Sequence, residues 1–213
     1  MRGSIFTVGM LLLALGITFN TMTGFGTSCI TAGYYAIYKA TPLSFAQACF
    51  GVYAIMLVLE FLVKGKERDW KDLSQLPFSL VYSILLEWME KLFMPIRFDT
   101  VWQNVLLLVA GVICIGIGTS MMLNMKVTAG PPDALAAAIG WRLKKGTGFG
   151  KNLLDSFCVL LALTVDLIAH GKLVSIGIGT VVSMICIGRV IAVFEHFCKD
   201  KLLRLSGMQQ TAK

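Results

Sequence analysis

The chain has 213 residues, of which 56% are hydrophobic and only 15% are charged, and its formal net charge is +7. Soluble domains carry about 25% charged residues. Three long stretches, 3–38, 40–59 and 100–125, contain no charged residue and no histidine. A bilayer core takes about 20 apolar residues per helix, so these stretches argue against a soluble protein with a buried core. Strand-period alternation is absent, which argues against a β-barrel. The composition predicts a polytopic, all-α membrane protein.

The first predicted span, residues 4–22, follows a single basic residue, as the apolar part of a signal peptide also would. No small-residue cleavage site comes before the next apolar segment, so we interpret it as an uncleaved span. A glycine-rich stretch and a short helical segment, 27–39, come next. Two further spans, 45–63 and 74–94, complete the first half of the chain.

The second half shows the same order of elements. A span at 101–123 is followed by a short segment at 132–145 and by spans at 150–169 and 173–195. At 1.5 Å per residue each short segment is about 20 Å long, which is less than the roughly 30 Å of a bilayer core. Each short segment therefore either crosses the membrane with distortion or enters and leaves at one face.

Lysine and arginine counts weigh these two topologies, because cytoplasmic loops are enriched in both residues. With re-entrant short segments and a cytoplasmic N-terminus, 14 of the 19 basic residues lie inside and four lie outside. If both short segments span the membrane, the division is 12 inside and six outside. The re-entrant topology is favoured, with six transmembrane helices, two re-entrant half-helices and both termini cytoplasmic.

The repeated order predicts two inverted repeats of span–half-helix–span–span. Each unit contains three full spans, an odd number, so the second unit enters the membrane from the opposite side, as in many transporters. The predicted units are residues 1–97 and 98–198, followed by a cytoplasmic tail at 199–213. A generic succession of helices and loops remains the alternative explanation of this order.

The two interruptions before the short segments predict a binding site. Non-helical backbone at membrane depth is tolerated only where protein buries it or where it lines a wet cavity. A helix that starts there offers free N–H groups to a ligand. The predicted substrate-binding residues are therefore the two helix starts, Gly26, Thr27, Ser28 and Cys29 in the first unit and Gly130, Pro131, Pro132 and Asp133 in the second.

Individual residues of this set have more than one interpretation. Gly130 is expected to make a sharp turn, and Pro131 and Pro132 preset the backbone for a helix start. Asp133 is either a simple cap of its helix or a group that binds a proton, a cation or a substrate amine. Cys29 is either a small packing residue or a reactive thiol at a helix N-terminus.

Two charges fall inside predicted spans. Glu87 and Arg189 occupy related depths in the last span of each unit. Charges within a membrane are costly and are functional candidates by default, and a pair costs less than a lone charge. An ion pair between Glu87 and Arg189 is therefore predicted, either structural or part of a gate.

Several motifs resemble a known family. The stretches "AGPPDALAAAI", "GTGFGKNLLD" and "GIGTVVSMICIG" resemble the bacterial YczE/YitT-like integral membrane proteins over Gly111–Phe194. The first half lacks the proline and aspartate that these proteins often carry at the matching break. The family is largely uncharacterised and is described as transporters or permeases, so the resemblance implies a transporter fold in the bacterial cytoplasmic membrane and no particular substrate.

The expected function is that of a small transporter or permease that moves a small polar solute through a midplane site between the half-helices. A channel-like pore and a non-transporting substrate-capture or regulatory subunit are the alternatives. No HExxH, GxSxG or nucleophile–base pair occurs, so the chain is not expected to be an enzyme. The six cysteines form no CxxC, so no metal or cofactor is expected. The expected partners are the lipid bilayer and the solute, without nucleic acid, and a homo-oligomer is left open.

Overall fold

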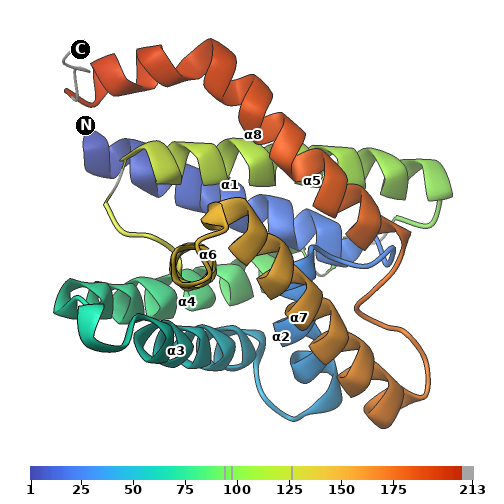
Figure 1. Ribbon diagram of the computed structural model, residues 1–213. Helices are drawn as coiled ribbons and strands as arrows, with labels where there is room; N and C mark the ends of the chain where they lie inside the picture. The colour runs from blue at the N-terminus through green and yellow to red at the C-terminus, as the bar shows by residue number, and fades with distance from the viewer. Residues whose placement is uncertain (94, 97, 126, 208–213) are drawn as a thin grey trace.

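The computed structural model describes residues 1–93, 95–96, 98–125 and 127–207. All regular structure within these residues is helical (Figure 1). The long helices are α1 (Arg2–Met22), α3 (Phe45–Lys64), α4 (Gln75–Phe93), α5 (Val101–Met125), α7 (Gly146–His170) and α8 (Ile178–Leu205). Two short helices, α2 (Cys29–Ala40) and α6 (Pro131–Arg142), and two 3₁₀ turns, η1 (Gly65–Glu67) and η2 (Trp70–Ser74), complete the described fold.

Five helices among the described residues are long and apolar enough to cross a membrane, namely α1, α3, α5, α7 and α8. The sixth predicted span corresponds to α4, which has 19 residues but is not one of the five. Glu87, Glu90 and Lys91 all lie near its C-terminal end and make that end polar. The chain therefore has the composition of a multi-pass membrane protein.

The predicted order of long and short helices is present, and most of the predicted ends agree with the structure within a few residues. The largest difference is α8, which begins at Ile178 rather than 173 and continues to Leu205, inside the predicted tail. It begins late because Asp166 of α7 accepts hydrogen bonds from the N–H groups of Val174 and Ser175, which hold this segment outside the helix. Positions 94, 97 and 126 of the predicted units and positions 208–213 of the predicted tail lie outside the described residues.

Helices α1 and α5 form a tight antiparallel pair (Figure 1). A Cβ on Gly16 would lie 2.6 Å from the carbonyl oxygen of Gly111, and a Cβ on Gly118 would lie 2.6 Å from that of Gly9. The two glycines are seven residues apart in each helix, so they face the partner together. Because the glycines have no side chain, the two backbones approach closely, as at other membrane helix interfaces.

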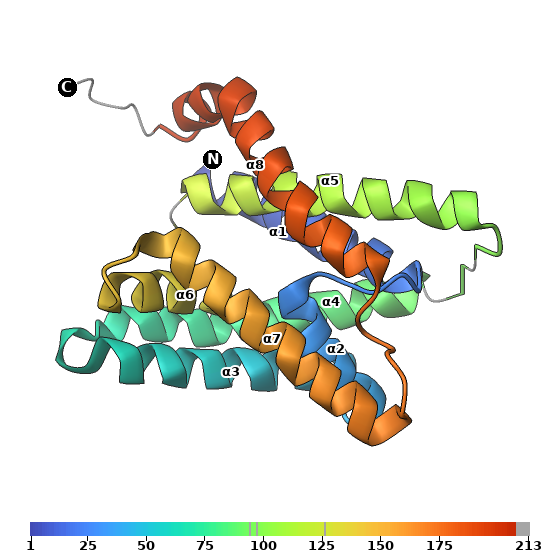
Figure 2. The same ribbon diagram turned by 45° about the vertical axis from the view of Figure 1, so that its right-hand side comes forward.

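The two short helices pack on the same pair of long helices. Both α2 and α6 contact α3 and α7. The start of α2 and the connection before α6 enter the bundle from its two ends (Figure 2). Both termini and the α3–α4 connection lie at one end of the molecule (Figures 1 and 2).

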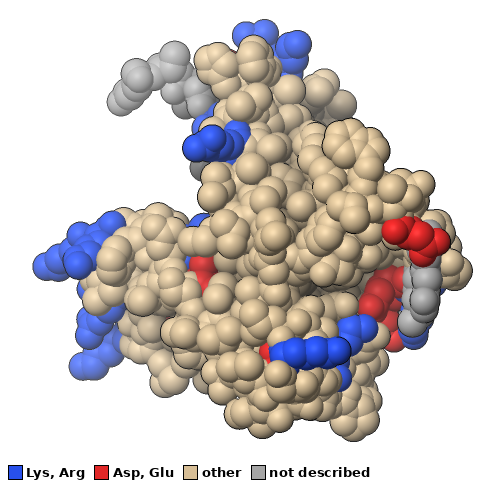
Figure 3. Space-filling model, turned by 90° about the vertical axis from the view of Figure 1, so that its right-hand side faces the viewer, with Lys and Arg blue, Asp and Glu red and all other residues tan. Residues whose placement is uncertain are grey.

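Exposed charged side chains cover only parts of the surface. On the face shown in Figure 3, lysine, arginine, aspartate and glutamate gather in a few places and leave a wide uncharged area. Large apolar side chains are exposed on the long helices, for example Ile55, Leu106 and Val181. Exposed apolar surface of this extent is expected where helices face lipid rather than water.

Candidate functional site

The start of α6 is built by its sequence, Gly-Pro-Pro-Asp. The two prolines have no N–H group and occupy the first two helical positions. The N–H groups of Asp133 and Ala134 both donate to the carbonyl oxygen of Gly130, at 3.0 Å. The prediction that this helix start offers free N–H groups is therefore wrong, because its prolines lack them and its next two donors are paired.

Gly130 also differs from its prediction. Its φ of −66° and ψ of 145° are extended, as the residue before a proline prefers. The nearest atoms to an added Cβ would be 3.8 Å away, on Asp133 and Pro132. The turn conformation expected of Gly130 is absent, because the prolines direct the chain without it.

The start of α2 does provide free donors. The backbone carbonyl of Ser28 accepts from Ala32 at 2.7 Å. Among the described residues no acceptor binds the N–H groups of Cys29, Ile30 and Thr31. These three groups are the unpaired donors that a helix N-terminus is expected to have.

One cavity of about 680 Å³ contains both helix starts. All eight α-helices contribute to its wall, so it lies at the centre of the bundle. Five of the eight predicted site residues line this central cavity, namely Ser28, Cys29, Gly130, Pro132 and Asp133. The structure thus brings together residues that are about a hundred positions apart in the sequence.

The remaining three predicted residues lie outside the lining of the central cavity. Gly26 has a φ of +90°, and a Cβ there would overlap the backbone nitrogen of Gly177. Thr27 is buried, and its backbone N–H donates to the carbonyl oxygen of Ser175 at 3.1 Å. Pro131 is buried in α6. These residues position the helix starts rather than line the cavity.

Charged groups of α7 also line the central cavity. Lys151 and Asp155 are one turn apart on this helix and therefore lie on one face. Asp155 is 9% exposed, whereas Lys151 is exposed. Neither Asp155 nor Asp133 has a hydrogen-bond or ion-pair partner among the described residues. Among the described residues the cavity therefore holds two carboxylates without a hydrogen bond or ion pair, and the nearby Lys151 attracts both electrostatically.

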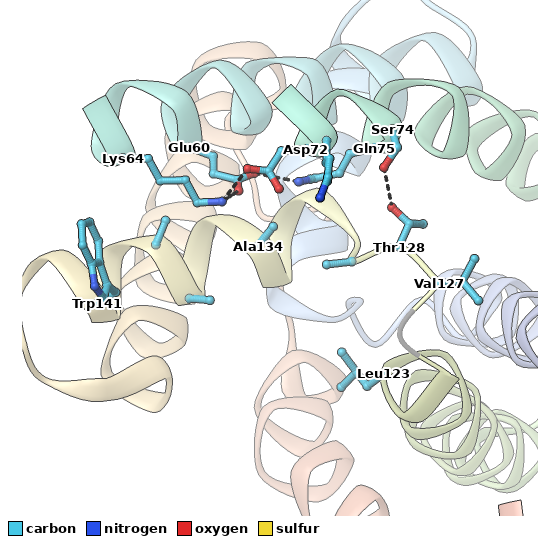
Figure 4. Close-up of a pocket in the computed structure, with 14 residues that line it drawn as sticks. Glu60, Lys64, Asp72, Ser74, Gln75, Leu123, Val127, Thr128, Ala134 and Trp141 are labelled. Carbon is cyan, nitrogen blue, oxygen red and sulfur yellow. Dashed lines mark hydrogen bonds and ion pairs between the residues drawn. The ribbon is translucent and has the colours of Figure 1, made fainter. Parts of the chain in front are cut away.

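A second cavity of about 600 Å³ adjoins the central cavity (Figure 4). It lies between α3, η2 and α6 and is polar at one side, where Lys64 bridges Glu60 at 2.5 Å and Asp72 at 2.6 Å. We call it the side cavity. It shares five lining residues with the central cavity, namely Leu123, Thr128, Ala129, Ala134 and Ala137. On the α6 side, the shared wall consists of two alanines, Ala134 and Ala137.

The predicted ion pair between Glu87 and Arg189 is not formed. Glu87 accepts hydrogen bonds from the Ser44 hydroxyl at 2.6 Å and the Ala46 N–H at 3.0 Å, and it pairs with Lys91 at 2.5 Å. Arg189 is exposed on α8 and has no ion-pair partner among the described residues. Because α4 packs on α3, Glu87 reaches the start of α3 and caps it instead.

Neither Asp155 nor Lys151 is among the predicted site residues, although both line the central cavity. The sequence did contain a signal for Asp155, because this carboxylate lies inside an apolar stretch, one turn after a lysine. The aromatic wall of the central cavity, Tyr53, Phe78 and Tyr82, gave no such signal. Aromatic residues at helical spacing are usual in any buried core.

The part of the chain that the structure describes contains no group of three His, Cys, Asp or Glu residues arranged to hold a metal ion. The six cysteines are free thiols, and Cys29 is buried at the cavity wall. The polar groups that the central cavity offers a ligand are therefore carboxylates, hydroxyls, one lysine, the Asn152 amide and the free N–H groups at the start of α2.

Comparisons with known proteins identify a family without assigning an activity. The model of a family of unknown function, DUF6198, matches residues 1–196, and the chain belongs to this family. A relative from Bacillus subtilis (strain 168), the uncharacterized protein YyaS, is 25% identical over 195 residues, which cover 91% of this chain and 92% of the relative. No solved structure matches the chain.

Proposed function

We propose that this member of the DUF6198 family is a small transporter or permease of the bacterial cytoplasmic membrane. A small polar solute would occupy the central cavity between the starts of α2 and α6. The observation that carries the proposal is that both helix starts and the charged face of α7 line one cavity of about 680 Å³. Binding sites at the meeting point of broken helices are typical of secondary transporters.

The proposal includes six spans, two re-entrant half-helices and an inverted repeat, with α4 as the sixth span and both termini cytoplasmic. Each short helix has 12 residues, or about 18 Å at 1.5 Å per residue, which is too short to cross. The reciprocal packing of α2 and α6 on α3 and α7 supports two units related by symmetry. The relationship to YczE/YitT-like proteins that the sequence motifs suggest belongs to this proposal.

The side cavity supports a route from the cytoplasmic face to the central cavity. It borders the α3–α4 connection, where basic residues are concentrated. The alanines of α6 that line both cavities leave a thin wall, so a small displacement of α6 would join the two spaces. Alternating access then requires α6 to move toward and away from α3, and a channel would keep the two spaces joined.

The test is solute uptake into proteoliposomes that hold the purified chain. The vesicles are incubated with a mixture of small metabolites, and their contents are measured by mass spectrometry against protein-free vesicles. We expect one solute class to accumulate with saturation, and Ala137→Trp to abolish this accumulation because it fills the wall between the cavities. Ala169→Trp is the matched control, since Ala169 is exposed and outside both cavities.

Three outcomes separate the functional candidates. Accumulation that does not saturate indicates a channel. Equal contents in vesicles with and without protein contradict transport by this chain alone and favour a capture or regulatory subunit. Equal uptake by the Ala137→Trp variant and the wild type contradicts the route through the α6 wall.

A further inference from the structure

The charged residues that line the central cavity differ in how far they are buried. Asp155 is 9% exposed, lines the cavity and has no hydrogen-bond or ion-pair partner among the described residues. Burial of a carboxylate without a partner is costly, and the cost falls when a donor or a cation binds it. The exposed Lys151, one turn away, does not reach Asp155 within ion-pair distance.

Asp133 adds a second carboxylate to the same cavity. It lies in the first turn of α6, a helix that packs against α7, and it too has no hydrogen-bond or ion-pair partner among the described residues. Both carboxylates come from the second half of the chain, on two helices that pack on each other. A ligand between them would meet two acceptors.

The rest of the wall is largely apolar and includes three aromatic rings. Tyr53 and Tyr82 stack with ring centroids 6.2 Å apart, and Phe78 and Tyr82 stack at 5.8 Å. All three residues line the cavity. Aromatic faces attract cations as well as apolar groups, so the wall suits an apolar body that carries a positive charge.

We propose that the central cavity selects an organic cation, a protonated amine on an apolar or aromatic body. The amine donates to Asp155 and Asp133, and the body packs on the aromatic wall. This inference rests on the proposed function and adds the substrate class. The free N–H groups at the start of α2 are the competing feature, because they would accept a carboxylate or another oxygen acceptor.

The experiment compares four probes that share a phenyl body and differ in the head group. They are 2-phenylethylamine, 2-phenylethanol, 3-phenylpropanoate and phenylalanine, which are a cation, a neutral molecule, an anion and a zwitterion. Binding to the purified chain in detergent is measured by isothermal titration calorimetry. We expect the amine to bind at least roughly tenfold more tightly than each of the other three, because charge-assisted hydrogen bonds exceed neutral ones by about this amount.

Two variants locate the binding group. Asp155→Asn and Asp133→Asn should each weaken amine binding roughly tenfold, while Asp200→Asn, the same change at an exposed position of α8, should leave it unchanged. Thermal unfolding of each variant checks that it is folded. If a variant does not fold, the order of the four probes on the wild type decides the question by itself.

The outcomes distinguish this inference from the proposed function. Amine binding that depends on Asp155, without uptake into proteoliposomes, supports the cation site and contradicts transport. Uptake or binding that favours the alcohol, the anion or the zwitterion contradicts the cation site and leaves transport standing. Tight binding of phenylalanine would assign the α2 N–H groups a role beside the carboxylates and overturn selection for a simple cation.

Discussion

The two breaks that precede the short helices reach the same cavity by different means. The first break, residues 23–28, contains Gly26 in a positive-φ conformation of +90°. The second break, residues 127–130, ends at Gly130 in an extended conformation, followed by two prolines. A glycine determines the direction of the first break, whereas prolines determine that of the second.

The breaks also differ in how they are anchored. The carbonyl oxygen of Phe25 accepts from the N–H of Gly179 at 2.7 Å, and the N–H of Thr27 donates to Ser175 at 3.1 Å. The corresponding contact of the second break is between two hydroxyls, Ser74 and Thr128, at 3.3 Å. The first break is held by backbone-to-backbone hydrogen bonds, which require the two segments to approach closely and therefore favour glycine. The second break is directed by its prolines and needs no such close approach.

The largest expected effect tests the two glycines directly. Gly26→Ala should lower the free energy of unfolding by about 3 kcal/mol, because positive φ is costly with a Cβ and the added atom overlaps the backbone of Gly177. Gly130→Ala should change it by no more than about 0.5 kcal/mol, since its conformation is ordinary and the space is open. Unfolding in detergent, followed by circular dichroism, measures both. Similar losses in the two variants would remove the contrast between the breaks.

A buried carboxylate holds each of the two connections that contact the breaks. Asp166 holds the α7–α8 connection, and Glu60 holds the α3–α4 connection. Asp166 lies one turn before the end of α7 and is fully buried. Its Oδ2 accepts from the N–H groups of Val174 and Ser175 and from the Ser175 hydroxyl, at 2.7 to 2.9 Å. Glu60, one turn before the end of α3, is also fully buried and accepts from Lys64 and Gln75 instead.

The second comparison is between the stabilities of alanine variants at these two carboxylates. Asp166→Ala should cost about 2 to 3 kcal/mol, because it leaves buried backbone N–H groups without an acceptor. Glu60→Ala should cost less, about 1 kcal/mol, because Lys64 keeps its pairing with Asp72 at 2.6 Å. Chemical denaturation of both variants ranks them, and a larger loss for Glu60→Ala would contradict backbone anchoring as the stronger device.

The third comparison sets Glu87 against Arg189, which were expected to pair. Glu87→Ala should lower the free energy of unfolding by about 1 to 2 kcal/mol, because the Ala46 N–H and the Ser44 hydroxyl at the start of α3 lose this acceptor. Arg189→Gln should have an effect below about 0.5 kcal/mol, since the side chain is exposed and has no ion-pair partner in the described part of the chain. Thermal melting of the two single variants and the double variant measures the coupling between them. We expect none, and a coupling well above experimental error would restore the ion pair.

The smallest effect has the opposite sign. Thr27 has a buried hydroxyl that finds no hydrogen-bond partner within the described residues. Thr27→Val keeps the shape and removes the unpaired group, so it should raise the free energy of unfolding by about 0.5 kcal/mol. Thr128→Val in the second break should be neutral, because its hydroxyl contact at 3.3 Å is exposed. A destabilised Thr27→Val variant would indicate that the hydroxyl has a partner in the native protein.

Much of the fold was predictable because its signals are local. The long apolar runs predict the long helices, and the glycine and proline clusters predict the two breaks within a few residues. The glycines at 9 and 16 and at 111 and 118, seven apart in each case, also carried a readable signal for the α1–α5 interface. Interruption and periodicity need only neighbouring residues, so a sequence displays them directly.

The site was predictable only in part, because its members meet through space. The sequence determined that Ser28, Cys29, Pro132 and Asp133 begin short helices, but the rotation of each helix decides which of its side chains reach the cavity. Because α4 packs on α3, Glu87 accepts hydrogen bonds from the start of α3 and does not pair with Arg189. Packing of α7 at the cavity made Asp155 a lining residue. Partners and burial depend on contacts between helices far apart in the chain, and these contacts exist only in the tertiary structure.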